Sequence, residues 1–178
     1  MPPRDVAATV AARLVVEPFR TKGPMGTEIE RKFLVTDPSI VEAAPGLVLR
    51  QGYLSREAAR TVRVRIAGDH AWLTVKGVTT GARRSEWEWE IPTSDAQGML
   101  AICDGPILDK TRHRIEHGGR TWEVDVFGGA NAGLVVAEVE LQSEDEPFEL
   151  PDWAGQEVSH DPRYLNVNLV HHPFRDWR

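Results

Sequence analysis

The sequence predicts a mainly β protein with a minor helical part (α+β), in which antiparallel strands close into a barrel flanked by a few helices. Beyond residue 25, short segments alternate apolar and charged residues, and turn sequences link them as hairpins. Charged residues keep one parity in nearly every segment, while apolar residues keep the other. Closing such a sheet puts the charged rows in a solvent-filled lumen and leaves the apolar rows to be covered by helices.

The first predicted elements lie before residue 54. The segment TEIERKFLV (27–35) alternates charge with apolar residues and predicts the first strand. Asp37 followed by Pro38 is an N-cap with proline at the first helical position, so we expect a short helix that ends near Ala44. The segment LRQGYL, from Leu49, resumes an extended strand.

The middle of the chain predicts a hairpin followed by a further strand. Residues 62–66 and 71–76 alternate in character and are joined across Gly68-Asp69, which favours a tight turn. We expect a loop over 77–81, followed by a strand in which Trp87 and Trp89 face the hydrophobic core.

The last third predicts one helix, three strands and a closing helix. Ser94 is expected to cap the helix that Gly105-Pro106 ends. Strands are predicted near 110–116, 120–127 and 134–142, with Gly118-Gly119 as the turn between the first two. Asp161-Pro162 then caps an amphipathic helix. Its residues Tyr164 and Asn166 are expected to hold this helix over a mouth of the lumen.

Composition limits the class of protein. A chain of 178 residues with 41% hydrophobic residues can bury one core, so we expect a flexible extension over 1–24 and a single domain over 25–178. The net charge of -6 argues against general nucleic-acid binding. Cys103 is the single cysteine, and no cysteine and histidine residues have the spacing of a zinc site, which indicates a reducing, cytoplasmic setting. No apolar run approaches the ~20 residues of a membrane helix.

The charged residues of the predicted lumen suggest a particular kind of ligand. Arginine and lysine clusters stabilise phosphate oxygens, arginine often with two hydrogen bonds. Carboxylates without thiolate or imidazole are hard oxygen ligands, which suit Mg²⁺ or Mn²⁺. Together these residue types predict a site for a metal–polyphosphate complex.

The motifs and their order resemble those of the CYTH superfamily of triphosphate tunnel metalloenzymes. The resemblance runs from about Thr27 to Phe174 through EIERKFLV, LRQGYL, RVRI, LTVKG, RSEWEWE, DKTR, EVDVF, AEVEL and DPRYLN. It implies an eight-stranded antiparallel barrel and, among the short bacterial members, a metal-dependent inorganic triphosphatase that cleaves tripolyphosphate to pyrophosphate and phosphate. Other branches act on nucleoside or thiamine triphosphates or cyclise ATP, and a polyphosphate-binding module without turnover is a further alternative.

The resemblance also implies a role for each charged position. The metal ligands would be Glu28, Glu30, Asp125, Glu138 and Glu140. The phosphate-binding cations would be Lys32, Arg63, Arg65, Lys76, Arg84, Arg112 and Arg114. The catalytic residues would be Lys110, which influences activation of the attacking water, and Glu86 and Glu88. Together with Asp125, these two glutamates would help to hold a second metal or orient the water. We expect a small-molecule triphosphate as partner, no nucleic acid, no membrane, and a homodimer as one option. Tyr53 is expected to pack, with substrate contact or a hydroxyl bridge across the sheet as the alternatives.

Overall fold

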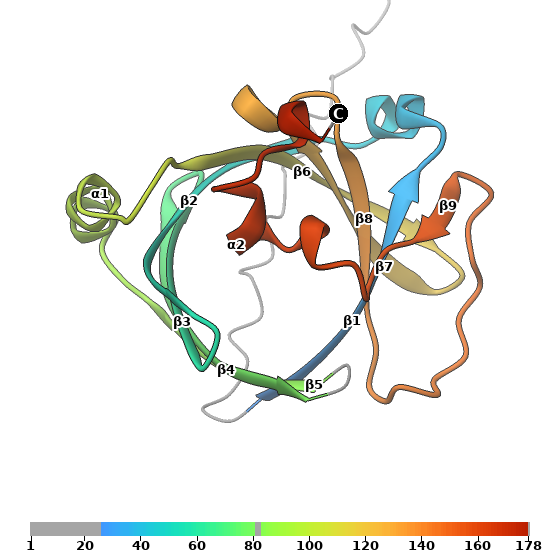
Figure 1. Ribbon diagram of the computed structural model, residues 1–178. Helices are drawn as coiled ribbons and strands as arrows, with labels where there is room; N and C mark the ends of the chain where they lie inside the picture. Colours follow the sequence, from blue (N-terminus) through green and yellow to red (C-terminus); the bar gives the residue numbers. More distant parts are fainter. Residues whose placement is uncertain (1–25, 81–82, 178) are drawn as a thin grey trace, which may run out of the picture.

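The computed structural model describes residues 26–80 and 83–177, and it is built mainly from β-strands (Figure 1). The predicted extension over 1–24 therefore lies outside the described residues. The strands are β1 (Gly26–Val35), β2 (Gly46–Glu57), β3 (Arg60–Ala67), β4 (His70–Thr80), β5 (Arg83–Glu90), β6 (Leu108–His117), β7 (Arg120–Phe127), β8 (Val135–Glu140) and β9 (Ala154–Glu157). The helices are η1 (Pro38–Ala43), α1 (Thr93–Ala101), η2 (Gly129–Asn131), η3 (Pro162–Tyr164), α2 (Asn166–Leu169) and η4 (Phe174–Asp176), where η marks a 3-10 helix.

The strands form one antiparallel sheet in the order β5-β4-β3-β2-β6-β7-β8-β1-β9. Strand β1 also pairs with β5, the strand at the other end of this order, with Gly26 opposite Glu86 and Glu28 opposite Arg84. The described sheet has nine strands, so the expectation of eight is wrong in number. The additional strand β9 is four residues long and pairs with the end of β1.

The predicted hairpin turns are present where glycine permits them. Gly68 has φ +58°, and Gly118 and Gly119 have φ +58° and +72°, a left-handed region that other residues adopt at a cost. Each turn joins two antiparallel strands, β3 to β4 and β6 to β7. Strand β4 continues to Thr80, so the loop expected at 77–81 is strand over most of its length.

Apolar side chains on the outer face of the sheet pack in two places. Helix α1 lies outside the curve of the strands (Figure 1), and its Ala96 packs with Val64 and Ala71 of β3 and β4. It begins at Thr93 after Pro92, so Ser94 is not its cap. A second cluster on β1, β7 and β8 is centred on the fully buried Trp122.

The expectation that Trp89 is a core residue is wrong. Its side chain is 52% exposed, and Trp87, two residues earlier on the same face, is only partly buried. Helix α1 packs on β2, β3 and β4. Helix α1 therefore does not cover the outer face of β5, which carries both tryptophans.

The chain after β9 lies across one end of the curved sheet, where Figure 1 shows α2 in front of the strands. Asp161 caps η3 through the Arg163 amide, as predicted, but the expected single helix is divided into η3 and α2. Leu169 of α2 is fully buried with Tyr53, Leu108 and Phe127 of the strands. Across the described residues, no helix is long and apolar enough to span a membrane.

Candidate functional site

The charged side chains lie on one face of the sheet, which we call the charged face. Residues directly opposite each other on paired strands share a face, as do residues two apart along one strand. The register gives Lys32 opposite Glu138, Lys76 opposite Glu86, and Arg112 opposite Asp125. Helix α1 covers the other face from outside, so the charged face is the concave inner one (Figure 1).

A cavity of about 60 Å³ opens on the charged face beside α2. It is lined by Glu30, Lys32, Tyr53, Thr61, Arg63, Lys76, Arg84, Leu165, Asn166 and Val167. Four of these ten residues are Lys or Arg, and they come from β1, β3, β4 and β5. The cavity is small because cations and carboxylates of the charged face reach across to one another.

Lys32 joins two of the predicted metal ligands. Its ammonium lies 2.7 Å from Glu30 Oε1 and 2.5 Å from Glu138 Oε1. Burial opposes the charge on Lys32, but Glu138 and Glu30 outweigh it and raise the pKa of Lys32 well above its ordinary value. Glu138 is largely buried, yet Lys32 and Arg112 hold its pKa well below the usual range. Both groups are therefore charged at neutral pH.

Lys110, Arg112 and Asp125 form the most deeply buried part of the network. Asp125 is 0% exposed, and Lys110 donates to its Oδ2. Arg112 donates to both Asp125 oxygens, at 2.7 and 2.6 Å, and also to Glu138 at 2.8 Å and to Glu123. Both oxygens of Asp125, which the sequence places among the metal ligands, are thus engaged by cations.

The pKa of Lys110 is lowered from 10.5 to about 8. Burial is the main cause and the charge of Arg112 the next, while Asp125 and Glu138 oppose the shift. A lowered pKa agrees with the sequence, which attributes it to Arg112 and Arg114. Arg114 is instead half-exposed and donates to Glu123 at 3.3 Å.

Glu88 anchors two predicted phosphate-binding arginines. It lies 3.4 Å from Arg63 Nη2 and 3.3 Å from Arg65 Nη2, and Thr74 Oγ1 donates to it at 2.7 Å. Although Glu88 is largely buried, Arg65 and Arg63 lower its pKa. Its contacts make Glu88 a group that positions cations. Glu86 has a similar neighbour, with Lys76 Nζ at 2.9 Å.

The remaining predicted site residues lie on β1 or directly opposite it on β5 and β8. Arg84 lines the cavity and donates to Thr61 Oγ1 at 2.6 Å and to the Gly77 carbonyl at 2.8 Å. Glu140 lies opposite Glu30 across the β1–β8 pairing and is exposed. Glu28 lies in β1, but its side chain falls outside the described part of the structure.

Carboxylate oxygens on β1 and β8 have the chemistry that Mg²⁺ or Mn²⁺ requires. Glu30 and Glu140 are directly opposite, and Glu138 is two residues from Glu140 on the same face. In the described ranges, 26–80 and 83–177, no three acidic, histidine or cysteine side chains are gathered as a ready metal site. Lys32 lies between two of the candidate ligands, so metal binding requires it to exchange partners.

Sequence reasoning missed several polar residues of the site. Tyr53 lines the cavity, although packing was the use we expected ahead of substrate contact. Gln51 Nε2 donates to its hydroxyl at 3.1 Å. Burial raises the pKa of Tyr53, so it stays a neutral hydroxyl. The signal was the shared parity of Gln51 and Tyr53 with the charged rows of the neighbouring β3. Asn166 lines the cavity as expected, whereas Tyr164 packs edge-on against Trp177 at 4.9 Å.

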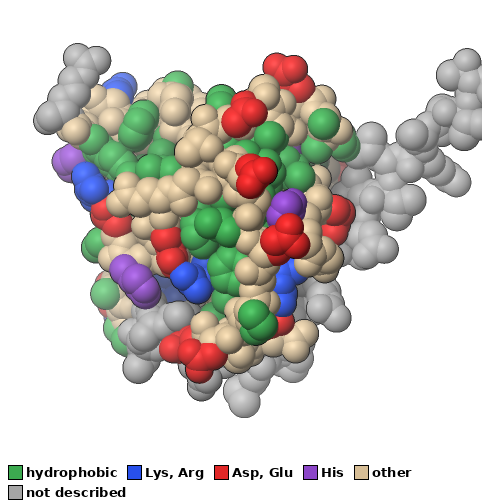
Figure 2. Space-filling view, turned by 90° about the vertical axis from the view of Figure 1, so that its right-hand side faces the viewer, with side chains coloured by type: hydrophobic (Ala, Val, Ile, Leu, Met, Phe, Trp, Pro, Cys, Tyr) green, Lys and Arg blue, Asp and Glu red, His purple; other side chains and the backbone are tan. Residues whose placement is uncertain are grey.

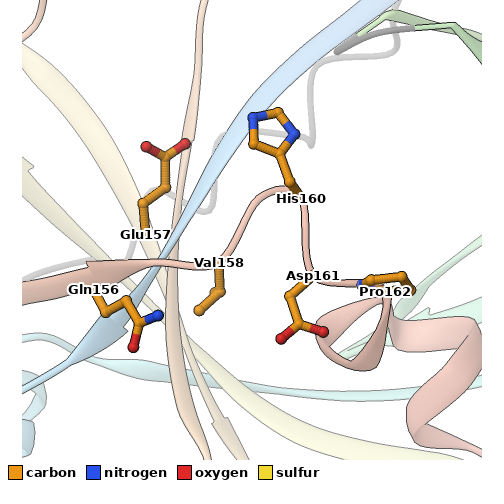
Figure 3. A pocket seen from close by; sticks show the side chains of 6 residues that line it. All are labelled: Gln156, Glu157, Val158, His160, Asp161 and Pro162. Carbon is orange, nitrogen blue, oxygen red and sulfur yellow. The ribbon is translucent and has the colours of Figure 1, made fainter.

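A larger hollow of about 460 Å³ lies along β9 and the segment after it. It is an open groove, and Figure 3 shows its side chains leaving the backbone in different directions. Glu157 is engaged by Arg31, and Asp161 by Arg163. The lining contains no Lys or Arg, so this groove does not suit a polyphosphate.

Figure 2 shows the side of the molecule that lies to the right in Figure 1. Acidic, basic and apolar side chains are interspersed on this side.

Comparison with known proteins identifies the family. The CYTH domain model matches residues 26–172. The chain belongs to the CYTH domain family. A relative named inorganic triphosphatase, from Acetivibrio thermocellus, is 46% identical over 155 residues, which cover 86% of this chain and 99% of the relative. The CYTH resemblance of the sequence motifs is thereby confirmed.

Two further matches cover most of the CYTH domain. An inorganic triphosphatase from Nitrosomonas europaea is 38% identical over 150 residues, which cover 81% of this chain and 97% of the relative. A crystal structure named for an inorganic triphosphatase superposes with a TM-score of 0.58 at 34% identity, covering 80% of this chain and 97% of that one. The chain therefore spans nearly the full length of the relatives it matches.

Proposed function

We propose that this CYTH protein is a metal-dependent inorganic triphosphatase, which hydrolyses tripolyphosphate to pyrophosphate and phosphate. The observation that carries the proposal is the cavity whose lining brings Lys32, Arg63, Lys76 and Arg84 together beside Glu30. Cations from four strands suit an extended polyanion, because each phosphate then meets a different cation. Relatives that are named inorganic triphosphatase support the choice of substrate.

The proposal includes the closed form of the sheet. Strands β1 to β8 form a tunnel, with β9 attached outside on β1, and the pairing of β1 with β5 supports this closure. A small-molecule partner belongs to the same proposal, since a net charge of -6 disfavours nucleic acid as a general partner. The cytoplasm is the proposed location, because a single cysteine offers no internal disulfide.

The proposed mechanism relies on positioning and charge neutralisation. Phosphoanhydride hydrolysis requires little covalent chemistry from the protein, so cations that hold the phosphate oxygens and orient the chain for in-line attack carry most of the effect. Lys32, Arg63, Lys76 and Arg84 bind the chain, with Arg65, Arg112 and Arg114 further along the charged face. Binding requires them to exchange carboxylate partners for phosphate oxygens.

Glu28, Glu30, Glu138 and Glu140, with Asp125, are the proposed ligands of Mg²⁺ or Mn²⁺. The bound cation would neutralise phosphate charge. Glu86 and Glu88 keep Lys76, Arg63 and Arg65 in place and so orient the substrate against the attacking water. Lys110 is the proposed acceptor of a hydrogen bond from that water in its neutral form.

Phosphate release from tripolyphosphate, ATP and thiamine triphosphate, each with Mg²⁺ and with Mn²⁺, tests the substrate. We expect tripolyphosphate to be hydrolysed most efficiently. Tyr53 is the aromatic residue in the cavity lining, and it is buried, so the described cavity offers a nucleobase no exposed ring on which to stack. Faster hydrolysis of ATP would reject the substrate assignment, and binding of tripolyphosphate without turnover would reject the enzyme.

Pyrophosphate is expected to be a poor substrate and an inhibitor. The cations are spread over β1, β3, β4 and β5, and a chain of two phosphates satisfies only part of this set. Binding energy that the missing phosphate would contribute is then lost from the transition state. Comparing kcat/KM for the two compounds under the same metal concentration checks this expectation, and equal values would contradict it.

Lys110 is expected to give the enzyme an alkaline pH profile. With its pKa at about 8, the fraction of neutral amine rises through pH 8, and the rate should rise with it. Because the folded pKa lies below the ordinary 10.5, the unfolded chain binds more protons between about pH 8 and 10.5, and stability should also rise through that window.

The variant Lys110→Ala separates this role from simple charge neutralisation. We expect a flatter and less alkaline rate profile, with a smaller loss of activity than a metal-ligand variant shows. Rates are measured against pH at saturating metal for both proteins. A variant that binds more weakly but keeps the wild-type profile shape would remove Lys110 from the catalytic residues.

A further inference from the structure

The charged face ends in an apolar wall on β2, β3 and β4. Trp72 is 2% exposed and forms a buried cluster with Leu49 and Ala67, against which Leu47 packs. Trp72 lies directly opposite Arg65, and Leu49 lies directly opposite Ala67. Since opposed residues share a face, this cluster projects to the same side as the cations of the cavity.

The register fixes the order of residues from the cavity to the far end of the sheet. Arg63, which lines the cavity, is opposite Thr74, and the next inward pair along β3 and β4 is Arg65 and Trp72. The following pair, Ala67 and His70, ends the hairpin. The His70 side chain is 48% exposed and stacks on Trp72 with ring centroids 5.8 Å apart. Trp72 therefore lies between the cavity side and solvent at this end.

Along β3, Arg65 is the last cation before the wall. Its guanidinium carbon lies 5.1 Å from the centre of the Trp72 ring. Burial and the neighbouring charge of Arg63 lower the pKa of Arg65 to about 10, although Glu88 opposes the shift, so a further anion beside Arg65 would favour its charged form. Beyond Arg65, a phosphate would meet tryptophan, leucine and alanine side chains. Lys110 lies opposite Leu49 across the β2–β6 pairing, but its ammonium is held by Asp125. A phosphate in this cluster would have to displace buried apolar side chains, which is costly.

We propose that Trp72, supported by Leu49 and Ala67, is the inner limit of the polyphosphate site and restricts the enzyme to short chains that enter and leave beside α2. At that mouth, Leu165 and Val167 line the cavity, so a chain too long for the interior would place a phosphate against aliphatic side chains. This inference rests on the proposed triphosphatase function and adds a residue that sets the length of the substrate.

The test compares kcat/KM for tetrapolyphosphate with kcat/KM for tripolyphosphate. Wild type should favour tripolyphosphate. Trp72→Ala removes the wall and should raise the tetrapolyphosphate to tripolyphosphate ratio by about tenfold, the scale of discrimination that pocket size gives. Trp72→Phe keeps an aromatic wall and should leave the ratio near wild type. Trp87→Ala is the matched control, because Trp87 lies opposite Val75 on the outer face of the sheet.

The outcomes separate the inference from the proposed function. A wild-type enzyme that hydrolyses both chains equally well, or a folded Trp72→Ala variant with an unchanged ratio, would overturn the role of Trp72. Failure of wild type to hydrolyse tripolyphosphate at all would instead overturn the proposed function. If melting curves show that Trp72→Ala does not fold, Trp72→Leu, which keeps an apolar but shorter wall, is the deciding variant, and an unchanged ratio there also rejects the proposal.

Discussion

Glu30→Ala is expected to lose tripolyphosphate turnover by about 10²- to 10³-fold, the effect of removing one preorganised electrostatic group from a phosphoryl-transfer site. Glu30 lines the cavity and lies opposite Glu140, where a divalent cation would be held. The fold should persist, because Lys32 keeps Glu138 at 2.5 Å after Glu30 is removed. The same loss is expected for Glu28→Ala.

Initial rates of phosphate release over a range of Mg²⁺ and Mn²⁺ concentrations measure this effect, and a thermal melt checks the fold. Glu42→Ala, an exposed carboxylate in η1 away from the charged face, is the control and should behave as wild type. Turnover by Glu30→Ala within about threefold of wild type at saturating metal would remove Glu30 from the proposed ligands, because a lost ligand should cost several kcal/mol.

Asp125→Ala should lower the free energy of unfolding by about 3–5 kcal/mol, the cost of leaving buried cations without their partner. Asp125 is 0% exposed and accepts hydrogen bonds from Lys110 and from two nitrogens of Arg112. Arg112 keeps Glu138 and Glu123, whereas Lys110 loses the carboxylate to which it donates. The buried ammonium should account for much of the loss.

A surface ion pair on the adjoining β2–β6 pairing provides the control. Arg50 lies opposite Asp109, with Nε 3.1 Å from Oδ1, and both side chains are at least half exposed. Asp109→Ala should cost less than about 1 kcal/mol, because exposed pairs contribute little. Urea unfolding of both variants at pH 7 measures the difference, and equal effects would contradict the buried role of Asp125.

The sequence predicts most strands of this fold because their alternation is strict. Charged residues at every second position indicate which face meets the cavity. Gly68-Asp69 and Gly118-Gly119 indicate where the hairpins turn. Strand β9 was missed because AGQE has neither alternation nor β-branched residues, and its pairing with β1 depends on tertiary contact. The last helix was predicted as one piece, but Leu165 at the α2 N-terminus is extended, with ψ 129°.

Predicting the site from sequence gave the residues of the charged face but not their partners. The parity of Arg112 and Asp125 places both on that face, yet only the β6–β7 register shows that they lie opposite each other. Glu88 carries the same charge as the proposed metal ligands, and Asp125, itself one of them, is held by Lys110 and Arg112. Sequence alone cannot tell an acid that holds cations from one that holds a metal. Trp72 shares its parity with Lys76, so the apolar end of that charged row was present in the sequence but outside the motif pattern.

Strand β1 pairs with β5, β8 and β9, so the first described strand depends on segments synthesised much later. Local hairpins such as β3–β4 and β6–β7 can form early, because closing a short loop costs little chain entropy. The β1–β8 contacts raise the contact order, which predicts slow folding. The edge of β1 that faces β8 stays unpaired until β8 is synthesised. Glu30 comes from β1, and Glu138 and Glu140 come from β8. The acidic part of the site is therefore assembled in one of the last folding steps, and a nascent chain that stalls before β8 has no such site.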